Sequence, residues 1–146
     1  MEVSRTKRAI TLEAAQAMIR VAMDHAQSLG KGVSLAVVDE SGLQVATARM
    51  DAANAGTMQV AIDKAYTAAS SRISTHKWAE IVAGDEQLAA GAAAGIDRLI
   101  VFGGGQVIEI DGEVIGGIGC AGAHWTGDTE ITTAALQSLR DAGGAD

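Results

Sequence analysis

Hydrophobic and polar positions along this chain follow two periods, one typical of helices and one typical of strands. Apolar residues recur every three or four positions in three segments, which predicts amphipathic helices over 12–29, 58–72 and 126–142. Two shorter helical segments are expected over 75–82 and 85–94. The last helix should be capped by Thr126 or Asp128 and stop at Gly143-Gly144. Five runs rich in β-branched residues predict strands over 33–38, 43–49, 98–102, 106–110 and 113–118. This order, with short turns between strands, favours an α+β fold with a five-stranded antiparallel sheet and packed helices.

The strongest local signal is Asp111-Gly112, which stands between two of the predicted strands. A two-residue hairpin turn needs positive φ at both central positions, and Asp-Gly supplies this. The segment after the hairpin contains Gly117-x-Gly119-x-x-Gly122, the bare spacing of a dinucleotide fingerprint. The parallel strand and the acidic ribose contact of that motif do not follow, so these glycines predict close backbone packing and a bend.

Composition limits the classes of partner. The chain has 146 residues, 48% of them hydrophobic but only 3% aromatic, and a net charge of -7. We expect a flexible N-terminal arm over 1–10 and a single domain over 11–146. We also expect a homo-oligomer, because a partner subunit can easily cover a core of small residues. The charge opposes nucleic acid and anionic membranes as partners. One cysteine, no leader pattern and no membrane-length apolar run predict a cytoplasmic protein.

A first group of candidate ligand-binding residues surrounds the expected start of the second long helix. Arg49 precedes that helix, which begins near Thr57, and a cation beside a helix N-terminus is a seat for a carboxylate or phosphate. Asp51 lies at the same corner. The alternative is that Arg49 pairs with Asp51 or with Asp63 and only fixes the corner.

The second long helix also carries a polar stripe. Asp63, Lys64 and Tyr66 are its candidate hydrogen-bonding groups for a ligand in a cleft. A solvated helix face is the commoner explanation of such a stripe.

A second group of candidates lies just before and within the last predicted helix. Cys120 and His124 have the spacing of a thiol and an imidazole on one loop, and Asp128 or Glu130 could orient the imidazole for proton transfer. Trp125 would face a ligand beside them. H-E-x-x-H and C-x-x-C patterns are absent from the sequence, so no metal site is predicted.

Several short motifs together resemble one known family. They are A-V-V-D-E-S-G at 36–42, A-R-M-D at 48–51, D-K-A-Y-T-A at 63–68, F-G-G-G at 102–105 and D-G-E-V-I-G-G-I-G at 111–119. In this order, over about residues 10 to 142, they resemble the GlcG/HbpS family, the haem-degrading or DUF336 domain that is related to the C-terminal domain of PduO-type proteins. The resemblance implies a profilin-like fold, dimers or larger oligomers and, for some members, binding of haem or a cobalamin-related ligand.

The chain departs from the family pattern after the last strand, where Cys120-Ala121-Gly122 replaces the usual V-S-G. The resemblance therefore implies a small-ligand-binding protein for haem, a related tetrapyrrole or a small anionic metabolite, and leaves the ligating histidine open among His25, His76 and His124. The alternative is a small catabolic enzyme, a lyase, isomerase or hydrolase, with His124 moving protons.

Overall fold

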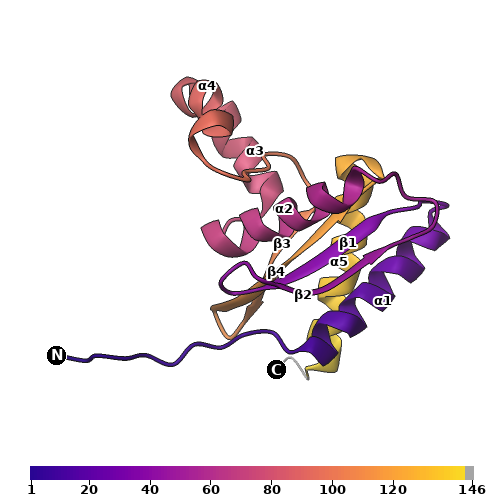
Figure 1. Cartoon of the computed structure of the whole chain (residues 1–146), viewed down its shortest axis with the longest axis horizontal. Helices are drawn as coiled ribbons and strands as arrows, with labels where there is room; N and C mark the ends of the chain where they lie inside the picture. The colour runs from indigo at the N-terminus through magenta and orange to yellow at the C-terminus, as the bar shows by residue number, and fades with distance from the viewer. Residues whose placement is uncertain (144–146) are drawn as a thin grey trace.

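The computed structural model describes residues 1–143 and contains one four-stranded antiparallel sheet in the order β2-β1-β4-β3 (Figure 1). Its strands are β1 (Ser34–Asp39), β2 (Gln44–Arg49), β3 (Gly105–Ile110) and β4 (Glu113–Ala121). The helices are α1 (Leu12–Ser28), α2 (Thr57–Ser71), α3 (Thr75–Ala83), α4 (Glu86–Gly95) and α5 (His124–Ala142). The α+β class is therefore confirmed.

The predicted hairpin at Asp111-Gly112 is confirmed. Asp111 has φ 52° and Gly112 has φ 74°, so both central positions are left-handed, and Ile110 pairs with Glu113 across the turn. Strand β4 continues to Ala121, three residues beyond the predicted end. Gly119, Cys120 and Ala121 therefore belong to the sheet, where they pair with β1.

The prediction of a strand over 98–102, and with it a fifth strand, is wrong within the described residues. Arg98 has φ 59°, which is incompatible with an extended strand. The Thr67 hydroxyl donates to the Arg98 carbonyl over 3.0 Å and accepts from the Ile100 N–H over 3.0 Å. These backbone groups are satisfied by α2 instead of a neighbouring strand.

The two faces of the sheet are covered differently. Helices α1 and α5 pack on one face, where a cluster of buried apolar side chains includes Met18 of α1, Leu35 of β1 and Ile131 of α5. Helix α2 lies on the other face and approaches β4 closely. A Cβ on Gly117 or Gly119 would collide with backbone carbonyls of α2, so the glycines permit this approach, as the packing interpretation predicted.

The start of α5 also differs from its prediction. The expected cap was Thr126 or Asp128, whereas the helix begins at His124 with Ala123 as its N-cap residue. The Asp128 carboxylate folds back from inside the helix and accepts from the Ala123 N–H over 2.8 Å. The predicted stop at Gly143-Gly144 is described as far as Gly143, and Gly144 lies outside the described residues.

Helices α3 and α4 pack against each other and project away from the sheet (Figure 1). At the other end, residues 1–9 are exposed and form neither helix nor strand. Ile10 is buried, and its N–H donates to the Ile115 carbonyl over 2.9 Å, so the arm joins the domain there. Within residues 1–143, no helix has the length and apolar character that crossing a membrane requires.

Candidate functional site

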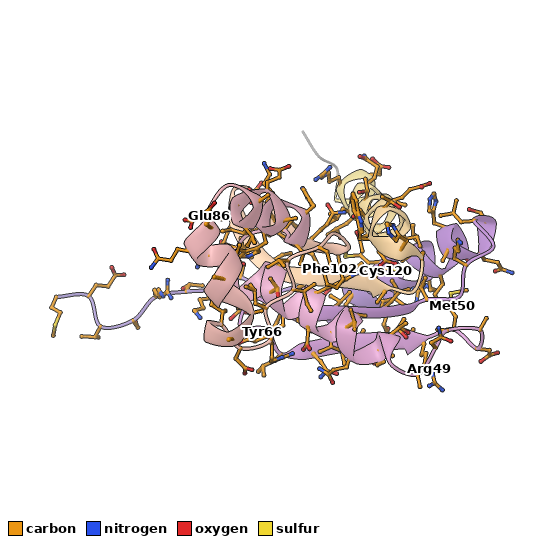
Figure 2. The ribbon with its side chains drawn as sticks, turned by 90° about the horizontal axis from the view of Figure 1, so that it is seen from above. Arg49, Met50, Tyr66, Glu86, Phe102 and Cys120 are labelled. Carbon is orange, nitrogen blue, oxygen red and sulfur yellow. The ribbon has the colours of Figure 1, made fainter. Side chains whose placement is uncertain are left out.

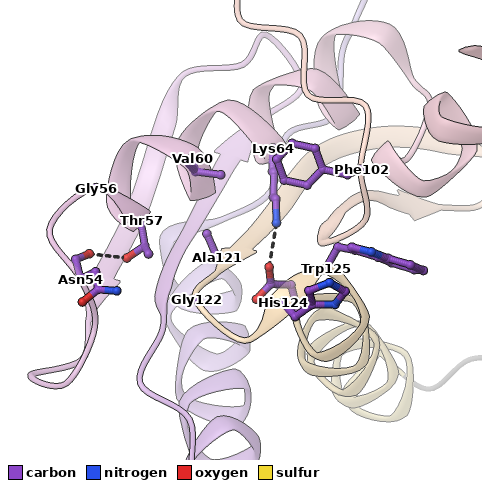
Figure 3. Close-up of a pocket in the computed structure, with 11 residues that line it drawn as sticks. Asn54, Gly56, Thr57, Val60, Lys64, Phe102, Ala121, Gly122, His124 and Trp125 are labelled. Carbon is purple, nitrogen blue, oxygen red and sulfur yellow. Dashed lines mark hydrogen bonds and ion pairs between the residues drawn. The ribbon is translucent and has the colours of Figure 1, made fainter.

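A pocket of about 380 Å³ opens between the N-terminal end of α2, the N-terminal end of α5 and the loop before β3 (Figure 3). Its walls are mainly apolar, with a few polar groups that converge on it, the usual composition of a small-molecule site. The lining residues are Asn54, Gly56, Thr57, Val60, Lys64, Phe102, Ala121, Gly122, His124, Trp125 and Asp128. The structure thus brings together five of the residues that the sequence marked as candidates, Thr57, Lys64, His124, Trp125 and Asp128.

The back of the pocket holds a buried ion pair between α2 and α5. The Lys64 ammonium lies 2.8 Å from Asp128 Oδ2, and the two side chains are 1% and 4% exposed. The same ammonium donates to the Cys120 carbonyl over 2.9 Å and lies 4.9 Å from the centre of the Phe102 ring. Three chain segments far apart in the sequence are therefore joined at one nitrogen atom.

The second carboxylate oxygen of Asp128 also accepts hydrogen bonds. Asp128 Oδ1 accepts from the Ala123 N–H and lies 3.7 Å from the Cys120 sulfur, which donates to it. Burial, with the nearby Asp128 charge adding to it and Lys64 opposing it, holds the pKa of the Cys120 thiol well above its ordinary value. Cys120 therefore stays protonated at neutral pH, which disfavours a thiolate nucleophile.

The glycines of the F-G-G-G segment pack directly against the ion pair. A Cβ on Gly104 would lie 2.7 Å from Lys64 Nζ and 2.7 Å from the Asp128 Cβ. A Cβ on Gly103 would lie 2.5 Å from the Thr129 hydroxyl. The close backbone approach allows Phe102 to stand over the pocket from this loop (Figure 3).

The mouth of the pocket carries His124 and Trp125, both exposed, whose ring centroids are 5.6 Å apart. His124 has φ 59°, and its Nδ1 is 3.1 Å from the Thr126 hydroxyl. Within the described part of the chain, Nε2 makes no hydrogen bond. The imidazole therefore keeps one nitrogen for a ligand.

The predicted seat at Arg49 is not part of this pocket. Arg49 ends β2 with an exposed side chain, away from Phe102 and Cys120 (Figure 2), and is absent from the lining residues. Asp51 lines a different hollow, with Gln27 and Lys31. The three residues predicted to form one ligand-binding corner therefore lie in different places. Of Arg49, Asp51 and Thr57, only Thr57 lines the pocket. The Thr57 hydroxyl also bonds to Ser34 over 2.9 Å.

Asp63 and Tyr66 hold the chain itself. Asp63 Oδ1 lies 2.9 Å from Arg98 Nε, and the Arg98 guanidinium stacks 3.8 Å from the centre of the Tyr66 ring. The alternative pairing of Asp63 with Arg49 is therefore replaced by a pairing with Arg98. These contacts fasten the segment that leads to Phe102.

The remaining candidates separate onto other surfaces. Glu130 Oε1 lies 2.9 Å from His25 Nε2 on α1, so this carboxylate orients a different imidazole from the one predicted. His76 on α3 has a buried Nδ1 without a hydrogen-bond partner within residues 1–143. Neither His25 nor His76 lines the pocket. Among the described residues, no three His, Cys, Asp or Glu side chains gather as metal ligands.

The lining residues that the sequence did not mark as site residues are Asn54, Gly56, Val60, Phe102, Ala121 and Gly122. Phe102 is the sole phenylalanine and begins the F-G-G-G motif, which is the signal that pointed to it. Asn54 and Val60 carried no comparable signal, because their contribution depends on where α2 begins in space.

The fold and the pocket together define a small α+β protein with one mainly apolar site at the meeting point of two helix ends. The model of the family described as haem degrading protein HbpS-like matches residues 10–137. The chain belongs to this family.

Three similar proteins place the chain within the family. An uncharacterised 15.0 kDa protein from the dhaT-dhaS intergenic region of Citrobacter freundii is 31% identical, over 90% of this chain and 93% of that protein. The crystal structure of Klebsiella pneumoniae ORFY superposes with a TM-score of 0.89 at 29% identity, covering 95% and 96% of the two chains. PduOC, solved as a haem complex, gives a TM-score of 0.81 at 28% identity, covering 89% and 94%.

Proposed function

We propose that this protein binds haem or a related tetrapyrrole in the pocket between α2 and α5. The observation that carries the proposal is His124, whose Nε2 is uncommitted at the mouth of an apolar pocket between two exposed aromatic rings. Haem needs an axial donor and apolar surfaces for its macrocycle, and both are present here. The family and the haem complex of PduOC support the same ligand class.

The lining residues fit such a group. The Thr126 hydroxyl holds His124 Nδ1 and so sets the ring orientation, as second partners of ligating histidines do. Phe102 and Trp125 are 44% and 48% exposed, and they offer flat apolar surface to a macrocycle. Bound haem would supply the redox chemistry of its iron, and His124 would be the residue that holds it.

A haemin titration followed by absorbance tests the proposal. Wild-type protein should develop a saturable Soret band, and His124→Ala should lose it or weaken the affinity at least tenfold. His25→Ala is the matched control, because His25 lies on α1 and pairs with Glu130 outside the pocket. Equal affinity in wild type and His124→Ala would reject His124 as the ligand, and nonsaturable uptake by wild type would reject the site.

The second candidate ligand is a small anionic metabolite, and the ends of the two helices favour it. Gly56 of α2 and Ala123 of α5 give their helices no side-chain cap, and the pocket lies at both N-termini. Uncapped N–H groups and the positive helix ends attract a carboxylate. In a Trp78→Phe variant, where Trp125 is the single tryptophan, malonate should then change the fluorescence with saturation, and a linear response would exclude binding there.

The enzymatic alternative remains a prediction. Asp128 is bound to Lys64 and Glu130 to His25, so neither carboxylate is hydrogen-bonded to His124. Haem binding needs no such relay. We also propose that the protein forms a homo-oligomer, which the small-residue core supports. The layered α+β arrangement supports a profilin-like fold. The single cysteine supports a cytoplasmic location.

A further inference from the structure

The four lysines of the chain occupy two different environments. Lys7, Lys31 and Lys77 are exposed, whereas Lys64 is 1% exposed and lies at the back of the pocket. Lysine is almost never fully buried unless it is paired. The pairing with Asp128 explains how Lys64 tolerates burial, but this pair also lines a cavity that opens to solvent (Figure 3).

We propose that Lys64 is a reactive amine that forms a Schiff base with a small aldehyde or ketone entering the pocket. Lysines set in apolar pockets are the ones that proteins use for this chemistry. Val60, Phe102 and Ala121 line the same pocket as Lys64 and would hold the hydrocarbon part of such a molecule. This activity goes beyond haem binding and does not require it.

Asp128 provides the proton transfers that the reaction needs. Its Oδ2, 2.8 Å from Nζ, accepts a proton from the Lys64 ammonium, and the free amine attacks the carbonyl carbon. As the new C–N bond forms, the protonated Asp128 returns its proton to the carbonyl oxygen, which gives a carbinolamine. Asp128 then carries a second proton from the nitrogen to the same oxygen, the C–O bond breaks, and the oxygen leaves as water. The ammonium and the carbonyl compound thus give a protonated imine and one water, without an oxidant or reductant.

The product charge suits its surroundings. The protonated imine keeps the single positive charge of the original ammonium, so the carboxylate of Asp128 remains paired. The Cys120 carbonyl, 2.9 Å from the nitrogen, can accept the remaining N–H. The ring of Phe102, 4.9 Å away, presents its negative face to the same cation.

Reductive trapping with the wild-type protein tests the inference directly. The protein, free of haem, is incubated at pH 7 with propanal and sodium cyanoborohydride, and alkylation of each lysine is followed by peptide mass spectrometry. Lys64 should be alkylated at least tenfold faster than Lys31 and Lys77, which serve as internal controls in the same molecule. Alkylation of the exposed lysines with Lys64 unmodified would overturn the inference.

A haemin arm separates this inference from the proposed function. If both hold, saturating haemin should slow the alkylation of Lys64 and leave that of Lys31 unchanged. Selective alkylation in a protein that does not bind haemin would uphold the reactive lysine and reject the haem site. Haemin binding without alkylation of Lys64 in the haem-free protein would reject the reactive lysine alone.

Discussion

Replacing Lys64 by methionine isolates the energetic role of the buried pair. Met has an unbranched side chain of similar length, so Lys64→Met removes the charge with little change in volume. The carboxylate of Asp128 is 4% exposed and would remain buried without a cation. Breaking a buried pair in this way costs about 3–5 kcal/mol. For a chain of this size the melting temperature should fall by roughly 6–20 °C, at about 2–4 °C per kcal/mol.

Urea unfolding followed by circular dichroism measures this loss as a change in the free energy of unfolding. Lys31→Met is the matched control, because Lys31 is exposed, and it should change the free energy by less than about 0.5 kcal/mol. The double variant Lys64→Met with Asp128→Asn should recover about 2 kcal/mol, since the amide is neutral and still accepts from the Ala123 N–H.

Two results would refute the reasoning. A loss below about 1 kcal/mol in Lys64→Met would show that the pair is not desolvated, since only exposed pairs are worth so little. A double variant as unstable as the single one would show that the cost does not come from the uncompensated charge of Asp128. Either result would also show that Asp128 is not a buried, charged carboxylate at the back of the pocket.

Two further perturbations test the packing around the site. Burial raises the pKa of Cys120, so the folded state favours the neutral thiol. The stability that this thiol contributes is therefore complete below pH 9.0, the ordinary pKa of the group, and is lost as the pH rises above that value. Stability measured between pH 8 and pH 10 should therefore fall by about 1 kcal/mol more in wild type than in Cys120→Ala, and parallel curves would contradict the assigned burial effect. Gly119→Ala should cost at least about 1–3 kcal/mol in urea unfolding, because its Cβ would collide with the Ala61 carbonyl. Gly91→Ala, in exposed α4 with nothing within 4 Å, should instead stabilise by about 0.5–1 kcal/mol, and equal effects at the two glycines would exclude the close approach of α2 to β4.

Local signals predicted most of the secondary structure. Thr11 caps α1 by accepting from the Ala14 N–H over 3.2 Å, as a threonine before an apolar-periodic segment should. Asp111-Gly112 forms its turn because positive φ at two adjacent positions is a local requirement. The same reasoning failed at 98–102, where β-branched residues are tied to α2 by the Thr67 hydroxyl, a contact more than thirty residues distant.

The site was predicted in part, for a related reason. His124 and Trp125 could be found because an imidazole and an indole follow a glycine-rich strand, and Thr57 because helix ends bind anions. Arg49 lies outside the pocket, since a position near a helix start in sequence does not decide which side of that start a side chain occupies. Glu130 was assigned to His124, although its helical position directs it to His25 on α1.

The sequence by itself determined the periodic helices, the Asp-Gly hairpin, the α+β class and the family, because each depends on neighbouring residues or on an ordered series of motifs. Only the tertiary structure decided that Lys64 meets Asp128, 64 positions away, with Phe102 above the pair. Such a pair leaves no periodic trace in a sequence, since a lysine and an aspartate on polar helix positions look solvated until two helices and a glycine loop close around them. The chemistry proposed for the pocket rests on that closure.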